Sequence, residues 1–197
     1  MQSLKIPALV FLLFLAPAVT AQTPLANALS QKDTLTALGL IRAGENPNQL
    51  SDESSLLILY CRYSESDTMA YFLLRHGAKP DTLRTPAGRT ALHVAAAYYA
   101  CEPLCAALLD AGADINARTK DGATPLMLAA LSAKLRLIKF LISRSADPKL
   151  KDKAGKTAYD YALRADAMND MPDVKAHFEK TCGFSKPATL AYLKDLQ

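Results

Sequence analysis

One sequence pattern recurs at a nearly fixed interval and restricts the folds open to this chain. Residues 121–130 read DGATPLMLAA, residues 88–96 read GRTALHVAA, residues 155–162 read GKTAYDYA, and a weaker copy, SSLLIL, occupies residues 54–59. The four starts fall at 54, 90, 124 and 157, so the successive spacings are 36, 34 and 33 residues. A period of this size predicts an elongated stack of similar units, each packed on its neighbours.

Within one unit, the residue types predict a turn followed by a helix. Asp121 and Gly122 suit a tight turn. Thr124 can cap a helix through its hydroxyl group, and Pro125 fits the first helical position, where no backbone donor is needed. The small alanines that follow allow neighbouring helices to approach closely.

A second apolar run and a closing motif complete each unit. Residues 137–142 read LIKFLI and are followed by SAD at 145–147; the closing motif is GADIN at 112–116 and HGAKPD at 76–81. Upstream, LGLIRAGENPN at 38–48 has the form of the second half of a further unit. The chain is therefore expected to hold five units, of which the first and last are atypical because their outer faces meet water.

The longer units carry extra residues. We expect these residues in the turn between the paired helices, around residues 64–67 and 100–103.

This pattern resembles the ankyrin repeat, whose units begin D-G-x-T-P-L-H-x-A-A and end with G-A-D. The resemblance covers roughly residues 25–165 and implies an all-α solenoid of stacked helix-turn-helix units with projecting turns. The chain departs from the family pattern at Ser54 and Ser55, at Ala91 and Ala158 (Pro in the family), and at Met127 and Tyr159 (His in the family). These departures concern the capping and hydrogen bonding of single units.

The first 21 residues differ from the rest of the chain. Lys5 supplies a positive charge, residues 8–15 are continuously apolar, and Val19-Thr20-Ala21 offers small residues for cleavage. This pattern is typical of a secretory signal peptide, with cleavage expected after Ala21. The alternative is an uncleaved membrane anchor, although the apolar run is short for a span of about 20 residues. We expect a periplasmic or secreted protein with no stable membrane insertion after cleavage.

The rest of the chain divides into a repeat domain, residues 22–165, and a tail, residues 166–197. The units are expected near 22–50, 51–83, 84–117, 118–150 and 151–165. Residues 187–193 predict a last helix in the tail, which would cover the open end of the last repeat. A disordered tail is the alternative.

Charge is distributed unevenly along the predicted stack. The chain has a net charge of +4; residues 45–81 hold six acidic and three basic side chains, whereas residues 116–164 hold eleven basic and four acidic ones. This polarity would steer association with an acidic protein surface; the alternative is that these charges only keep exposed faces soluble. Nucleic acid is not an expected partner, because no base-stacking motif accompanies the charge.

The sequence lacks the patterns of a catalytic or cofactor site. Of its three histidines, His93 occupies the family position at which the imidazole bridges backbone groups of adjacent turns. A Ser-His-Asp order, a phosphate-binding glycine loop and an HExxH motif are all missing. We expect no enzyme activity, no cofactor, no metal, and a chain that is monomeric when free.

The four cysteines leave several pairings open. Cys101 and Cys105 lie in one loop-to-helix segment, and disulfides persist in oxidising compartments. A Cys101–Cys105 disulfide is one expectation; Cys61 paired with either of them, or reduced thiols, are the others. These thiols also motivate an alternative function, a thiol-based redox or haem-handling protein of the oxidative-stress response.

The resemblance implies that partner contacts come from the turn tips and from first-helix residues after the Ala-Ala pair. At these positions stand Arg84, Thr85, Arg89, Tyr98, Tyr99, Arg118, Lys120, Asp121, Ser132, Lys151, Lys153 and Lys156. Tyrosine and arginine are frequent hot spots of protein interfaces, although one tyrosine of the pair at 98–99 can instead pack inside its repeat.

The predicted function is therefore binding of another protein through the concave face and the turn tips. Exported bacterial proteins of this kind fall into two groups. One comprises immunity proteins against a delivered toxin, and the other comprises support or protection factors for a periplasmic enzyme.

Overall fold

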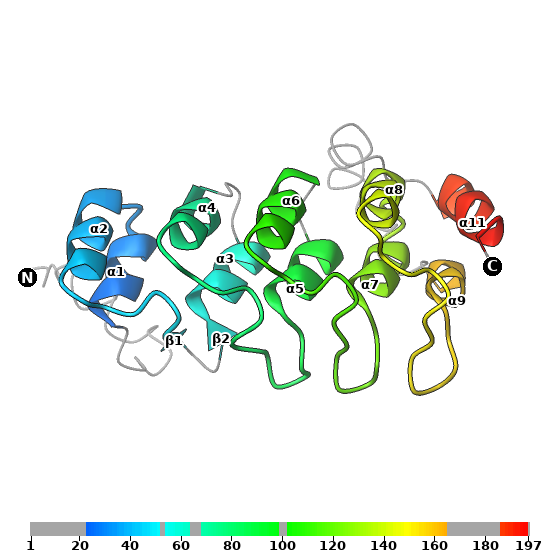
Figure 1. Cartoon of the computed structure of the whole chain (residues 1–197), viewed down its shortest axis with the longest axis horizontal. Coiled ribbons are helices and arrows are strands. Elements are labelled where there is room, and N and C mark those ends of the chain that lie inside the picture. The colour runs from blue at the N-terminus through cyan, green and yellow to red at the C-terminus, as the bar shows by residue number, and fades with distance from the viewer. Residues whose placement is uncertain (1–22, 52–53, 64–67, 99–101, 165–185, 197) are drawn as a thin grey trace, which may run out of the picture.

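The computed structural model describes residues 23–51, 54–63, 68–98, 102–164 and 186–196, which form an elongated stack of helix pairs (Figure 1). The first helices of the pairs are α1 (Pro24–Ser30), α3 (Leu56–Tyr63), α5 (Ala91–Ala97), α7 (Pro125–Leu131) and α9 (Ala158–Leu163). The second helices are α2 (Thr34–Arg42), α4 (Thr68–Arg75), α6 (Glu102–Asp110) and α8 (Leu135–Ser143); α11 (Lys186–Lys194) packs on α8 and α9. The predicted all-α solenoid is confirmed.

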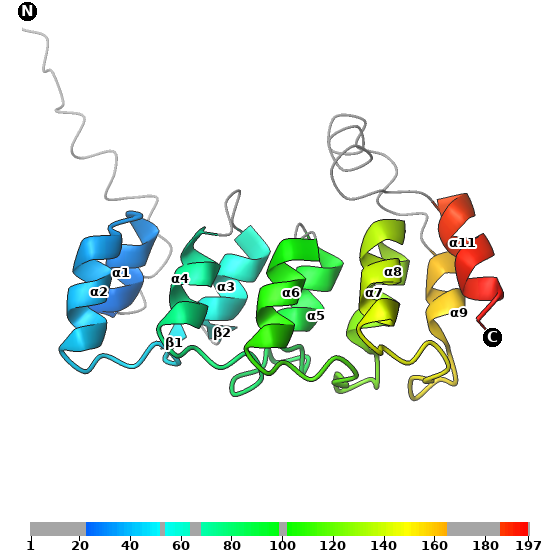
Figure 2. The ribbon, with the colours of Figure 1, turned by 45° about the horizontal axis from the view of Figure 1, so that its top comes forward.

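The helices form two rows, and long loops project from one side of the stack. In Figure 1 the first helices lie in the row nearer to the loops and the second helices lie in the other row. Figure 2, from a different angle, again shows the loops along one edge of the stack. We call three of these loops finger 1 (residues 82–90), finger 2 (residues 116–124) and finger 3 (residues 149–157).

A short β-pairing was not predicted from the sequence. Strand β1 (Leu50–Ser51) pairs antiparallel with β2 (Ser54–Ser55), with Leu50 opposite Ser55 and Ser51 opposite Ser54. The pairing lies in the loop between α2 and α3, so the helical stack itself is unchanged.

The extra residues of the longer units were expected around residues 64–67 and 100–103. Residues 64–67 and 99–101 lie outside the described residues, so for them the expectation stays a prediction. Glu102 and Pro103 belong to α6 and not to the turn before it.

The internal first helices α5 and α7 are buried on nearly all sides because each has a first helix on both flanks. All residues from Ala91 to Ala96 in α5 and from Pro125 to Ala130 in α7 are buried. Helix α5 packs against both α3 and α7, and α7 also packs against α9. Alanine suits these positions because a larger side chain would push the next repeat away.

A hydroxyl side chain marks the start of each first helix. The side-chain oxygens of Thr23, Ser55, Thr90, Thr124 and Thr157 accept the backbone N–H three residues later, at distances of 3.1–3.5 Å. Such a bond satisfies one of the donors that a helix start leaves without a partner in the helix. The second unit thus begins at Ser55 rather than at residue 54. The first unit has its own start signal, TPL at residues 23–25, which the sequence interpretation overlooked.

The capping bonds also correct the family alignment in the last unit. In three helices the side chain of the third helical residue accepts the backbone N–H of the cap residue. This third residue is His93 in α5, Met127 in α7 and Asp160 in α9. Asp160, not Tyr159, therefore takes the histidine position. Its Oδ2 accepts the N–H and the hydroxyl of Thr157 at 2.8 and 2.9 Å, and these bonds hold the pKa of Asp160 below its usual 3.8.

His93 links its own repeat to the next one. Its Nδ1 accepts the N–H of Thr90 at 3.2 Å, and its Nε2 donates to the carbonyl oxygen of Ala123 in finger 2 at 3.0 Å. Burial of the ring lowers the pKa of His93 to about 4, so the imidazole is neutral at pH 7. The structural role expected for His93 is confirmed.

This neutral histidine predicts acid sensitivity. Between its unfolded pKa of 6.5 and its folded pKa of about 4, the unfolded state binds a proton that the folded state does not. The free energy of unfolding should therefore fall by about 2 kcal/mol as pH drops from 7 to 5. Urea unfolding at both pH values measures the change. His93→Gln should be less stable at pH 7 but show a much smaller pH effect; an equal pH effect in the variant would contradict this assignment.

Candidate protein-binding surface

Each finger is a tight turn closed by its own hydrogen bonds. In finger 1 the N–H of Thr85 donates to the carbonyl of Arg89 at 3.0 Å, and Thr85 Oγ1 accepts the N–H of Arg89 at 3.1 Å. The same two bonds recur in finger 2 at 3.0 Å each. In finger 3, Asp152 takes this place, and its Oδ1 accepts the N–H of Lys156 at 2.8 Å. Thr85, expected as a contact residue, thus shapes the turn.

Neighbouring fingers are joined by backbone hydrogen bonds at their tips. The N–H of Lys120 in finger 2 donates to the carbonyl of Ala87 in finger 1 at 3.0 Å. The N–H of Lys153 in finger 3 donates in the same way to Asp121 at 2.9 Å. The three fingers therefore form a continuous array in which each tip is held by the next.

Glycine permits this close approach. Gly88 and Gly122 have φ angles of +78° and +83°, and a Cβ atom added to them would lie 2.8 Å from Lys120 N and 3.0 Å from Lys153 N. Gly155, the equivalent residue of finger 3, has φ +76°, but nothing lies within 4 Å of its Cβ position among the described residues.

Two predicted contact residues strengthen the same array. Arg84 Nη1 donates to the carbonyl of Arg118 at 3.0 Å, and Arg118 Nη1 donates to the carbonyl of Lys151 at 2.7 Å. Both side chains remain exposed, so a partner can still reach them. The structure nevertheless assigns them a role that the sequence interpretation did not include, which is to tie each finger to the next.

A second ladder, at the base of the loops, was also missed. Asn48 Oδ1 accepts the N–H of Lys79 at 2.6 Å, Asp81 Oδ2 accepts the N–H of Asp114 at 2.7 Å, and Asn116 Oδ1 accepts the N–H of Asp147 at 3.0 Å. The positions 48, 81 and 116 recur with nearly the repeat period. The recurrence of Asn or Asp four residues after the closing glycine, at 48, 81 and 116, was the available signal in the sequence.

Tyr98 lies at the end of α5, where it is half-buried. The guanidinium of Arg62 lies over its ring, 5.1 Å from the centroid. Ser132 supports this end of the helix, because its Oγ donates to the carbonyl of Ala97 at 2.8 Å. Ser132 is only 6% exposed, so its assignment as a partner contact is corrected: it connects two repeats.

Lys134 belongs to the same cluster and is 4% exposed. Its Nζ donates to the carbonyls of Ala96 and Tyr98, the latter through a very short contact. Burial lowers the pKa of Lys134 to about 8. A cation at a helix C-terminus is favourable, but this charge is not available to a partner. The sequence analysis included Lys134 among the eleven basic residues of the C-terminal half. Because it is buried, it does not contribute to the basic surface.

Two predicted residues, Tyr99 and Cys101, lie outside the described residues. The Cys101–Cys105 disulfide therefore stays a prediction. Cys61 and Cys105 are 3% and 0% exposed, and no disulfide joins these two described cysteines.

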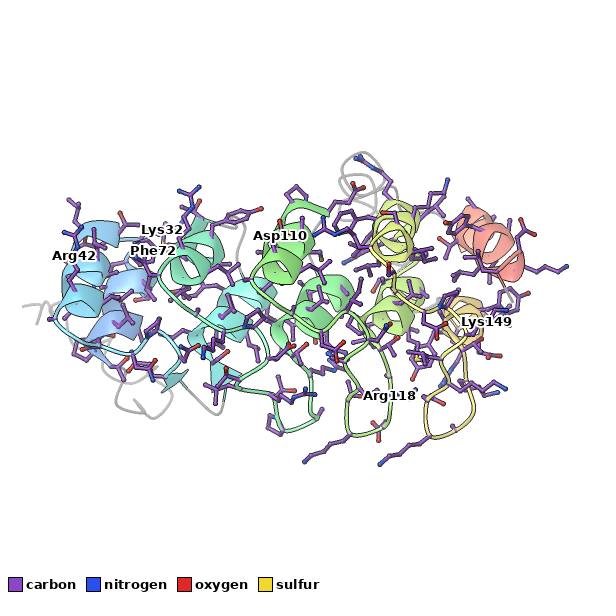
Figure 3. The ribbon with its side chains drawn as sticks, in the orientation of Figure 1. Lys32, Arg42, Phe72, Asp110, Arg118 and Lys149 are labelled. Atoms are coloured by element: carbon purple, nitrogen blue, oxygen red, sulfur yellow. The ribbon has the colours of Figure 1, made fainter. Side chains whose placement is uncertain are left out.

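The fingers carry five exposed lysines, which we call the finger lysines. These are Lys120, Lys149, Lys151, Lys153 and Lys156. None of them makes an ion pair with a described residue, whereas Arg136 and Arg144 pair with Glu102 and Asp110 on the second helices. Figure 3 labels Lys149 and Arg118 on this half of the stack, far from Lys32 and Arg42 at the other end.

Two carboxylates near the lysines of finger 3 accept hydrogen bonds within the fold. Asp152 accepts the N–H groups of Ala154 and Lys156 and the hydroxyl of Tyr161, and these bonds keep its pKa below 3.8. Asp160 serves as the cap partner of Thr157. The carboxylates of Asp152 and Asp160 are thus held by hydrogen bonds, while the finger lysines and Asp121 are exposed.

Of the predicted contact residues, those exposed on the fingers are Arg84, Arg118, Lys120, Asp121, Lys151, Lys153 and Lys156, and Arg89 is half-buried there. Among the described residues, no group of His, Cys, Asp and Glu is arranged to hold a metal ion. In the same part of the chain, no helix has the length and apolar character needed to cross a membrane.

Two family models match this sequence. A model described as ankyrin repeats in three copies matches residues 25–119, and one described as ankyrin repeats in many copies matches residues 108–162. The chain belongs to the ankyrin-repeat family. Ankyrin repeats are protein-interaction modules, so the surface described above is a candidate protein-binding surface.

Individual ankyrin-repeat relatives match only part of this chain. Mouse protein phosphatase 1 regulatory subunit 12A is 39% identical over 89 residues, which cover 45% of this chain and 9% of that protein. Zebrafish neurogenic locus notch homolog protein 1 is 32% identical over 121 residues, covering 60% and 5%. An ankyrin repeat-containing protein of Treponema pallidum (strain Nichols) is 38% identical over 96 residues, covering 49% and 32%. The chain thus spans less than a third of each relative.

The finger glycines provide a matched test of the array. Gly88→Ala should be destabilised by left-handed backbone strain of about 1–2 kcal/mol and by a further penalty of about 1–3 kcal/mol from the clash with Lys120 N. Gly155→Ala should show only the strain, because its Cβ would meet none of the described residues. Urea unfolding of both variants measures the difference. Equal losses of stability would mean that the fingers do not touch as described.

Proposed function

We propose that this chain is an exported ankyrin-repeat protein that binds an acidic surface of another protein through its fingers. The observation that carries the proposal is the group of five finger lysines, all exposed and none paired with a described carboxylate. Such charges attract a complementary surface and speed its approach. The hydrogen bonds between fingers support the proposal, since a fixed surface loses less entropy on binding.

Export rests on the sequence of residues 1–21, which lie outside the described residues. The position of the first repeat is compatible with cleavage after Ala21, because Thr23 caps α1 and Pro24 begins it. Removal of residues 1–21 would leave every described helix intact. We therefore propose a periplasmic or secreted location.

Two roles fit an exported binding module. One is an immunity protein that blocks a delivered toxin, and the other is a support or protection factor for a periplasmic enzyme. One relative that matches over 9% of its length is, by its name, a regulatory subunit of protein phosphatase 1, and this likeness favours the second role. The thiol-based redox or haem-handling alternative gains no support, because Cys61 and Cys105 are buried.

The experiment that tests this function captures the partner and then measures its affinity. The full chain is expressed with its own N-terminus in the source organism, and mass spectrometry of the purified protein should show a start at Gln22. A stoichiometric protein partner should co-purify at low salt. Lys120→Glu with Lys156→Glu should weaken its binding at least tenfold, and raised salt should weaken binding to the unmodified protein.

The control carries the same charge change in the N-terminal half of the stack, away from the finger lysines. Arg42→Glu with Lys79→Glu alters two exposed cations on α2 and in the loop after α4. This double variant should bind within about twofold of the unmodified protein. Equal weakening in both double variants, or the lack of any stoichiometric partner, would overturn the proposal.

A further inference from the structure

The finger array follows one rule at each internal contact. The later finger donates a backbone N–H to the tip carbonyl of the earlier one, as Lys120 does to Ala87. The earlier finger donates a side-chain N–H back, as Arg84 does to the carbonyl of Arg118. The tip glycine of the earlier finger leaves room for the later one, as Gly88 does beneath Lys120 N. All three features recur between fingers 2 and 3.

Finger 3 carries counterparts of these three features, and no fourth finger lies beside them among the described residues. Ala154 is the equivalent of Ala87, and its carbonyl accepts no hydrogen bond from the described residues. Lys151 is the equivalent of Arg84 and is exposed. Among the described residues, nothing lies within 4 Å of a Cβ atom placed on Gly155, and the residue keeps the positive φ of its counterparts. The outer edge of finger 3 is thus shaped like the contact sites inside the array, yet no described residue occupies it.

The described C-terminal helix does not fill this edge. Helix α11 packs on α8 and α9, in the helical part of the stack, and both Figure 1 and Figure 2 show it beside the helices and away from the loop of finger 3. The same edge carries Lys149, Lys151, Lys153 and Lys156, all exposed. Their charge favours an acidic occupant.

We propose that the outer edge of finger 3 binds an acidic turn of the partner protein, which takes the place of a fourth finger. The turn donates a backbone N–H to the carbonyl of Ala154 and presents a carbonyl or carboxylate oxygen to Lys151 Nζ. Its backbone passes over Gly155, and its acidic side chains face the surrounding lysines. This inference rests on the proposed function and adds to it the contact site and the shape of the bound segment.

The probe is a cyclic peptide that copies residues 115–123 of finger 2 with Arg118→Glu and Lys120→Glu, so that it is an acidic finger. A linear peptide of scrambled sequence has the same composition and charge. Affinity for the purified protein is measured by calorimetry, and amide shifts of the ¹⁵N-labelled protein locate the site. The cyclic peptide should bind at least tenfold more tightly than the linear one and should shift the amides of residues 151–156.

Two variants separate shape from charge. Gly155→Ala places a methyl group where the turn must pass and should weaken the cyclic peptide at least tenfold. Urea unfolding checks that Gly155→Ala is folded, since this variant is expected to lose less stability than Gly88→Ala. Lys151→Glu should weaken binding equally, whereas Arg42→Glu should leave it unchanged.

Three outcomes would overturn the inference: equal binding of the linear peptide, which indicates recognition of charge alone; unchanged binding to both Gly155→Ala and Lys151→Glu; or no saturable binding of the cyclic peptide. If Gly155→Ala still captures the natural partner at full affinity while the finger-lysine double variant does not, the proposed function holds and the inference about the edge fails. If neither variant loses the partner, both fail.

Discussion

The structure depends on one constraint: a turn that projects into solvent must hold its backbone in place without a core of its own. The chain meets this constraint across repeats. The N–H of Lys120 bonds to Ala87 and that of Lys153 bonds to Asp121, so each finger tip is ordered by its neighbour. His93 and the arginines Arg84 and Arg118 add side-chain bonds across the same boundaries. A typical hydrogen bond contributes about 1 kcal/mol net, so several per boundary determine whether the fingers are ordered.

This arrangement separates the groups that build the fingers from the groups that a partner can reach. The carboxylates of Asp152 and Asp160 accept hydrogen bonds within a turn and a helix cap. Lysines extend outward without ion pairs to described residues. The excess of basic over acidic residues between residues 116 and 164 is thereby presented on the fingers as a basic surface. A count of charged residues along the sequence misses this distinction. Lys134, for example, is charged but buried, so it adds no charge to the exposed surface.

The sequence predicted the features that arise within one repeat and the bridge made by His93, but it missed the other hydrogen bonds between repeats. Thr124 and Pro125 predict a helix start, since one can cap a helix and the other suits the first helical position. The period of 33–36 residues predicts the stack. The functions of Ser132 and Lys134 depend on carbonyls 35 to 38 positions away, at the end of α5, and no local pattern reports such contacts. The sequence indicated Arg84 and Arg118 only as partner contacts, because the carbonyls that they bond lie in the next finger. The error at Tyr159 was a shift of one residue, which the cap formed by Thr157 and Asp160 exposes.

The most direct test of this account is amide hydrogen exchange at the finger tips. Lys120 and Lys153 are exposed, so their amides would exchange within seconds if the fingers moved independently. The account predicts that both amides are protected at least a hundredfold relative to an unstructured peptide, and that Gly88→Ala removes the protection of Lys120 but not that of Lys153. Exchange of both amides at the rate of an unstructured peptide in the unmodified protein would contradict the claim that the fingers form one ordered binding surface.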